Sequence, residues 1–168
     1  IGQSDDSVMF VEKNVPFFIR RSRGYVPIPF YFDHKYFDML ALGGDLKNSF
    51  AISKDQFVIL SQYLGDMAEL KTYEAYEKTI SHFLKIYDLN PEVIVCDAHP
   101  NYYSKNILSK MANKRVIEIQ HHHAHIAGVL IDNNYDEQVI GLAFDGTGYG
   151  DDGTIWGSEF LIADKRQF

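Results

Sequence analysis

From residue 93 onward, short apolar segments alternate with longer segments whose apolar residues recur at the period of a helix. Short apolar runs bounded by turn residues are typical of buried strands. Strands that alternate with helices predict an α/β fold, with a mainly parallel sheet and flanking helices. The strands are predicted at Val93–Cys96, Arg115–Ile119, Gln138–Phe144 and Ile155–Ile162, and the helices at Tyr102–Ala112 and His122–Ile131.

The first half of the chain adds hairpins to this pattern, so the predicted sheet is mixed. One hairpin joins Val8–Val11 to Val15–Ile19, and another joins Met39–Leu42 to a strand near residues 49–53 through Gly43-Gly44-Asp45. Helices are predicted at Lys54–Tyr63, with Ser53 as N-cap, and at Met67–Tyr87. Residues 24–34 contain Gly24, Pro27 and Pro29 and are the predicted linker.

Composition and charge narrow the class of protein. A chain of 168 residues, 46% of them hydrophobic, can form a globular core. The net charge of −7 argues against a nucleic-acid partner, although Arg20, Arg21 and Arg23 form a local basic cluster. Cys96 is the only cysteine, which excludes an intrachain disulfide and a cysteine-based zinc site. Because the sequence shows neither a membrane span nor a secretory signal, we expect a cytoplasmic protein with no membrane partner.

Four of the seven histidines lie between residues 121 and 125. Positions four apart share one face of a helix, so His121 and His125 can bind one metal ion, as the histidines of an HExxH helix do. Imidazole is a common ligand of zinc and iron, but two ligands are too few, so a carboxylate must come from elsewhere. The alternatives are a solvated helix start or an affinity tag. A tag is disfavoured because Ala124 interrupts the run and an apolar helix follows it.

A glycine-rich acidic segment, residues 143–154, joins the last two predicted strands. Asp145 follows a buried strand, at a position where α/β proteins place functional groups, and it is the expected third metal ligand. Glycines let backbone amides approach a phosphate, which makes Gly146, Thr147 and Gly148 candidate nucleotide contacts. The alternative is an ordinary hairpin loop whose glycines and aspartates satisfy turn geometry.

Two further signals are weaker. Gly43, Gly44 and Lys47 could bind phosphate through backbone amides and an ammonium group, or they form an ordinary hairpin turn. Asp97 and His99 follow a buried strand, where functional groups occur, although helix capping explains Asp97 equally well.

Five segments resemble the hydrogenase maturation proteins of the HypF family. They read IRRSRGYVP, LALGGDLKNSF, DAHPNYYSK, QHHHAHIA and FDGTGYGDDGTIWGSEF. They occur in the family's order and cover nearly the whole chain.

The resemblance implies a part of a multidomain cytoplasmic carbamoyltransferase. Such an enzyme makes carbamoyl-adenylate from carbamoyl phosphate and ATP and passes the carbamoyl group to the C-terminal cysteine of its partner HypE, in nickel–iron hydrogenase maturation. Residues 1–25 would be the end of a YrdC-like domain, with Ser7 and Arg20 as nucleotide or phosphate contacts. Residues 30–168 would be the N-terminal half of the carbamoyltransferase domain, an actin-like ATPase (ribonuclease H-like) half-domain.

In that domain the family's histidine pair holds a catalytic divalent metal, zinc or iron. The resemblance assigns this role to His121 and His125, with Asp145 as the third ligand. It also implies that the glycine turns bind the nucleotide phosphates. Since the rest of both domains is absent, we expect the parent protein to be the enzyme and this chain alone to be inactive.

Other functions fit part of the same pattern. An O-carbamoyltransferase of the antibiotic or nodulation-factor type has a similar histidine motif and transfers to a sugar hydroxyl. A non-catalytic metal-binding module would use the histidines without chemistry. A tRNA-modification component is disfavoured by the acidic charge.

Overall fold

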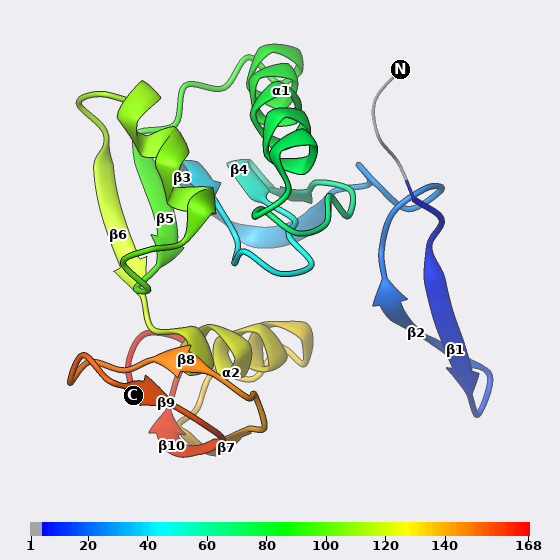
Figure 1. Cartoon of the computed structure of the whole chain (residues 1–168). Helices are drawn as coiled ribbons and strands as arrows, with labels where there is room; N and C mark the ends of the chain where they lie inside the picture. Colours follow the sequence, from blue (N-terminus) through cyan, green and yellow to red (C-terminus); the bar gives the residue numbers. More distant parts are fainter. Residues whose placement is uncertain (1–4) are drawn as a thin grey trace. The chain divides into compact units, whose positions relative to one another are not determined.

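The computed structural model describes residues 5–168, which divide into two compact units (Figure 1). Unit 1 contains the residues up to Cys96 together with Tyr102–Ile117. Unit 2 contains Glu118–Phe168 and the short segment Asp97–Asn101. Within residues 5–168, no helix is both long and apolar enough to cross a membrane.

A four-stranded sheet has the order β4-β3-β5-β6. Its strands are β3 (Phe30–Ala41), β4 (Ala51–Leu60), β5 (Val93–Asp97) and β6 (Arg115–Ile119). β3 pairs antiparallel with β4 and parallel with β5. β6 runs in the direction of β5, because the Arg115 N–H bonds to the Glu92 carbonyl at one end and the Ala98 N–H bonds to the Ile119 carbonyl at the other. The predicted α/β fold with a mixed, mainly parallel sheet is therefore confirmed.

The core of unit 1 lies between this sheet and the helix α1 (Leu70–Ile86), which confirms the helix predicted at Met67–Tyr87. The buried side chains of α1 are Tyr76, Ile80 and Phe83, whose spacing places them on one face. Phe50 contacts both the Tyr76 and Phe83 rings edge to face. The helix predicted at Tyr102–Ala112 is present as the short 3₁₀ helix η1 (Tyr103–Lys110).

The helix predicted at Lys54–Tyr63 is wrong, because these residues lie largely in β4. Ser53 does not cap a helix: its hydroxyl donates to the Phe37 carbonyl at 2.7 Å. The apolar, partly β-branched run 57–60 pairs with β3, so strand pairing prevails over the local helix signal. The predicted linker over residues 24–34 ends early, since β3 begins at Phe30.

The predicted first hairpin is confirmed as β1 (Val8–Glu12) and β2 (Val15–Arg20). Its two-residue turn places Lys13 and Asn14 at positive φ, 49° and 65°, which is the backbone of a type I′ turn.

Unit 2 consists of one helix on a two-stranded ribbon, with a second small hairpin beside it (Figure 1). Its elements are α2 (His121–Asp132), β7 (Val139–Ala143), β8 (Gly148–Tyr149), β9 (Ile155–Trp156) and β10 (Glu159–Ala163). Ile126 and Leu130 of α2 are buried with Ala163 of β10. The helix approaches the ribbon so closely that a Cβ on Gly141 would lie 2.3 Å from Ile126 Cδ1. The single strand predicted at Ile155–Ile162 is two strands, β9 and β10.

Candidate metal centre

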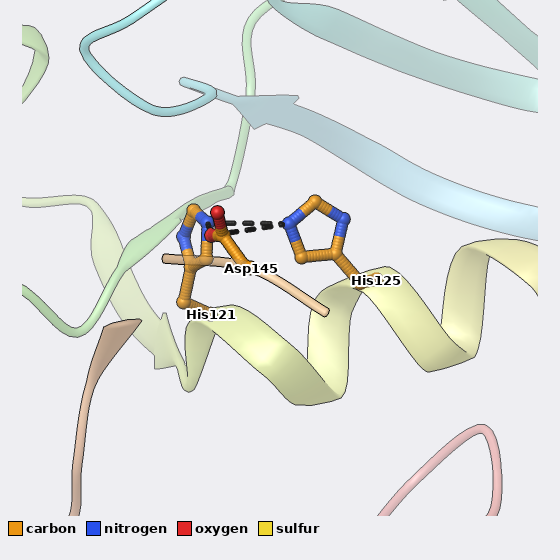
Figure 2. A group of neighbouring side chains, drawn as sticks. All are labelled: His121, His125 and Asp145. Atoms are coloured by element: carbon orange, nitrogen blue, oxygen red, sulfur yellow. Dashed lines mark hydrogen bonds and ion pairs between the residues drawn. The ribbon is translucent and has the colours of Figure 1, made fainter. Parts of the chain in front are cut away.

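The candidate site lies at the first turn of α2. Gln120 caps this helix, because its side-chain oxygen accepts the His123 N–H at 2.9 Å. The helix therefore begins at His121, and His125 follows one turn later on the same face. Asp145 comes two residues after β7, and Figure 2 shows its carboxylate beside the His121 ring with His125 facing both.

The three predicted ligands meet at their donor atoms. His121 Nε2 lies 2.8 Å from Asp145 Oδ2 and 3.2 Å from His125 Nε2. His125 Nε2 lies 3.7 Å from the same carboxylate oxygen. One donor atom from each residue thus falls within 4.8 Å of the others. The structure brings together the residues that the sequence proposed as a ligand set.

These separations fit a shared cation. A tetrahedral ion bound at about 2.1 Å holds neighbouring ligand atoms about 3.4 Å apart. The observed distances of 2.8, 3.2 and 3.7 Å lie on both sides of that value. Two imidazoles and one carboxylate suit zinc or iron, and three protein ligands leave a position for water or substrate, as in catalytic metal sites.

Asp97 contacts His121 on the side of the ring that faces away from the other two ligands. It is not among the predicted site residues. Its Oδ2 lies 2.6 Å from His121 Nδ1, on the side of the ring opposite Asp145. The hydrogen bond to Asp97, with a further contribution from Asp145, raises the pKa of His121 even though burial lowers it. The position of Asp97 at the end of a buried strand was noted from the sequence. Its pairing with a residue 24 positions later depends on the order of the strands.

The pKa of Asp145 is shifted in the opposite direction. Burial raises the pKa of this carboxyl group, but the Gly146 N–H and the charges of His121 and His125 outweigh burial and lower it. The carboxylate is therefore ionised at neutral pH, which is the form that binds a cation.

The other two histidines of the cluster, His122 and His123, are buried and pack inside unit 2. His122 is fully buried, its Nδ1 lies 3.2 Å from Gln120 Nε2, and its Nε2 has no hydrogen-bond partner among residues 5–168. Burial lowers the pKa of His122. His123 is buried as well, with Nε2 2.8 Å from the Asp164 carbonyl oxygen. The cluster thus divides into two candidate ligands and two packing residues.

The glycine turn after Asp145 shows two environments. Gly146 is exposed, and a Cβ at this position would meet no atom within 4 Å. Thr147 is exposed too, whereas Gly148 is buried against the His122 ring. Further along the turn, Asp152 accepts hydrogen bonds from the Thr154 N–H and hydroxyl and from Trp156 Nε1. Open space for a phosphate therefore exists at the Asp145 end of the turn.

The turn at Gly43 is held by its own side chains. Gly43 has φ +72°, and a Cβ there would lie 2.2 Å from the Ser49 carbonyl oxygen, so glycine is required. The Asp45 carboxylate accepts the Tyr103 and Ser104 N–H groups at 2.7 and 2.9 Å and thereby caps η1.

Arg20 and Lys47, predicted as separate phosphate contacts, line one cleft of about 360 Å³ in unit 1. Arg20 pairs with Asp5 at 3.5 Å and lies over the Tyr63 ring. Ser7 is used differently. Its hydroxyl accepts the Ser22 N–H at 2.8 Å and donates to the Arg23 carbonyl at 2.9 Å.

Comparison with known proteins identifies the group to which the chain is related. The family model described as the HypF Kae1-like domain matches residues 34–132, and the model of the second subdomain of the carbamoyltransferase Kae1-like domain matches residues 141–168. The carbamoyltransferase HypF of Synechocystis sp. is 44% identical over 94% of this chain. That of Rhizobium leguminosarum bv. viciae is 37% identical over the whole chain.

Solved structures agree with these matches. The crystal structure of full-length HypF in the phosphate- and nucleotide-bound form superposes with a TM-score of 0.89 at 40% identity, over 96% of this chain and 26% of that chain. The HypF of T. kodakarensis gives a TM-score of 0.83 at 39% identity, over 95% of this chain and 21% of that one. The predicted actin-like ATPase half-domain is confirmed by this likeness.

The chain spans 21% of the Synechocystis relative and 22% of the Rhizobium relative, about a fifth of each. The matched segments include the turn of α2 that carries His121 and His125 and the turn that carries Asp145. On these grounds the chain belongs to the HypF family of carbamoyltransferases.

Proposed function

We propose that this chain supplies the metal-binding half of a carbamoyl-transfer domain in a HypF protein. The complete protein would make carbamoyl-adenylate from carbamoyl phosphate and ATP and pass the carbamoyl group to the C-terminal cysteine of HypE, in the cytoplasm. The observation that carries the proposal is the convergence of His121, His125 and Asp145 within 4.8 Å, in a chain whose relatives are carbamoyltransferases.

The reaction itself is an acyl transfer. The cysteine thiolate attacks the carbamoyl carbon, a carbon–sulfur bond forms, and the bond to the adenylate oxygen breaks so that AMP leaves with its electron pair. His121, His125 and Asp145 would hold a divalent metal, which would supply Lewis-acid stabilisation to the oxygen on which negative charge develops. The chain's own residues orient the site: Asp97 holds the His121 ring, and the Gly146 N–H donates to Asp145 Oδ1 at 2.8 Å and so fixes the third ligand.

The proposal assigns residues 1–25 to the end of a YrdC-like domain and residues 30–168 to the N-terminal half of the transferase domain. The start of the Kae1-like match at residue 34 supports a boundary in this region. The nucleotide contacts would be Ser7, Arg20, Gly43, Gly44, Lys47, Gly146, Thr147 and Gly148. The shared cleft of Arg20 and Lys47 supports two of them, since two cations in one cleft attract a phosphate.

Metal content tests the ligand set directly. The untagged chain is compared with His121→Ala/His125→Ala, and His34→Ala/His82→Ala is the matched control, because it removes two exposed histidines from unit 1. We expect zinc or iron in the chain and in the control, and none in the first variant. The same non-zero metal content in all three proteins would exclude these ligands.

Transfer activity tests the reaction and the acceptor. A full-length HypF protein carrying this segment is assayed with ATP, carbamoyl phosphate and either a cysteine-terminated HypE tail or a sugar hydroxyl acceptor. We expect transfer to the cysteine and its loss in His121→Ala. Transfer to the sugar alone would identify an O-carbamoyltransferase, and unchanged transfer in His121→Ala would leave the histidines as a non-catalytic module.

A further inference from the structure

Both oxygens of the Asp97 carboxylate are engaged, and the side chain is 8% exposed. Oδ2 lies 2.6 Å from His121 Nδ1, while Oδ1 accepts the His99 N–H at 2.8 Å. The next residue, Ala98, donates its N–H to the Ile119 carbonyl at 2.9 Å, two residues before His121. The backbone hydrogen bonds of the strand ends therefore fix the carboxylate and the imidazole relative to each other.

The contact with Asp97 decides which nitrogen of His121 faces the ligand set. A carboxylate only accepts hydrogen bonds, so a His121 ring that offers its Nε2 lone pair to a cation must carry its proton on Nδ1, where Asp97 accepts it. Nε2 then has a free lone pair, and it is the atom that lies 2.8 Å from Asp145 and 3.2 Å from His125. His125 also meets the other two ligands through Nε2, but its side chain is 57% exposed, against 21% for His121.

We propose that Asp97 is the positioning residue of the metal centre, which orients His121 and holds it in the tautomer that binds a cation through Nε2. The proposal rests on the proposed metal-binding function of His121, His125 and Asp145. A carboxylate behind a metal-binding histidine fixes the ring and makes it more basic, and its loss weakens metal binding by about 10–100-fold.

A purely structural role for Asp97 predicts a different outcome, and one substitution separates the two. Asp97→Asn keeps an oxygen that accepts the His99 N–H, so the turn is preserved. The amide nitrogen that replaces Oδ2 donates instead of accepting. His121 can keep its hydrogen bond with residue 97 only if Nδ1 becomes the acceptor. The neutral ring then carries its proton on Nε2, and Nε2 has no lone pair left to bind a cation.

The experiment uses Co²⁺ as the probe, followed by visible absorption and by competition with Zn²⁺. The chain is compared with Asp97→Asn and with Asp132→Asn, which removes the same charge from an exposed position at the end of α2. Histidine-ring ¹⁵N NMR of the metal-free proteins at alkaline pH reads the tautomer of His121 independently of the metal, with Asp145→Ala added to each so that the carboxylate 2.8 Å from Nε2 does not compete for the proton. Asp97→Glu, which keeps the charge and the acceptor, is the rescue variant.

We expect Asp97→Asn to bind Co²⁺ about 10–100-fold more weakly, with a shifted absorption spectrum and the Nε2–H tautomer. Asp132→Asn should match the unaltered chain, and Asp97→Glu should recover the Nδ1–H tautomer. Equal affinity and an unchanged tautomer in Asp97→Asn would overturn the proposal. If the unaltered chain binds no Co²⁺, the proposed metal function fails in this chain, while the tautomer still decides whether Asp97 positions His121.

Discussion

Unit 1 and unit 2 differ most in how much apolar surface they bury. In unit 1 one buried cluster, which includes Leu40, Phe50, Tyr76 and Ile94, packs the strands of the sheet against α1 and η1. In unit 2 the buried cluster contains only Ile126, Leu130 and Ala163. Since burial of apolar surface is the main source of stability, unit 1 supplies the stable part and unit 2, which carries the candidate metal centre, is held by few contacts.

The ribbon of unit 2 explains this difference. One face of β7 and β10 packs against α2, and the opposite face is apolar and exposed. The exposed side chains are Ile140, Leu142, Phe144, Phe160 and Ile162, with exposed fractions from 50% to 76%. A ribbon covered on one side gains about half of the burial available to it, so the ligands of the metal centre lie on the less stable unit.

Truncating a core side chain in each unit should lower the free energy of unfolding by unequal amounts. Phe50 is fully buried against two rings, so Phe50→Ala should lower the free energy of unfolding by about 3–5 kcal/mol. Ile126→Ala should cost about 2–3 kcal/mol, because its cluster is small and lies near solvent. Urea unfolding is followed by far-UV circular dichroism, to which the 17 residues of α1 contribute more than the 12 of α2, and by fluorescence of Trp156, the only tryptophan, in unit 2. Equal losses would contradict the comparison.

The first two glycines after Asp145 should respond differently to an added methyl group. In Gly148→Ala the new Cβ would lie 2.5 Å from Cε1 of the buried His122 ring, so we expect a loss of about 1–3 kcal/mol. Gly146→Ala meets no atom within 4 Å and should change stability by less than about 0.5 kcal/mol. Thermal unfolding measures both. A loss of nucleotide binding in Gly146→Ala without a loss of stability would show that a phosphate approaches this backbone.

A residue of the site could be predicted where its pattern is local in the sequence, and not where its role depends on a contact between distant segments. The pair His121 and His125 could be proposed because four-residue spacing on a helix is a local pattern, and Asp145 because it ends a strand. The support from Asp97 was missed because it requires the order of β5 and β6. The same limit explains β4, where Ser53 indicated a helix cap but pairing with β3 decided the conformation. Nor does sequence spacing show that His122 is buried against Gly148.

Unit 2 should be easier to stabilise than unit 1, at a site away from its ligands. Gly128 is exposed within α2, and a Cβ there would meet no atom within 4 Å. Gly128→Ala should therefore raise the stability of unit 2 by about 0.5–1 kcal/mol, because alanine loses less conformational freedom than glycine in a helix. The Trp156 transition should move to higher urea, whereas a loss of stability would indicate a contact at this position.

The smallest expected effect is a pH dependence near neutrality that unit 2 shows and unit 1 does not. The raised pKa of His121 gives stability that is present below its ordinary value of 6.5 and is lost as the pH rises through the raised pKa. The lowered pKa of His122 gives stability that is present above 6.5 and is lost as the pH falls through the lowered pKa. The metal-free unit 2 should therefore be most stable near pH 6.5 and less stable on both sides.

The pKa shifts in unit 1 act outside this window. The pKa of Tyr73 is raised to about 12 by burial and by Glu77, so its contribution is lost only above pH 10. The hydrogen bond to Lys110 lowers the pKa of Glu77 from 4.5, so its contribution is lost only as the pH falls below that value. Trp156 fluorescence should therefore show a stability maximum where circular dichroism of α1 shows none. His121→Asn should remove the alkaline decline and leave the acidic one, and retention of both would assign the alkaline decline to another group.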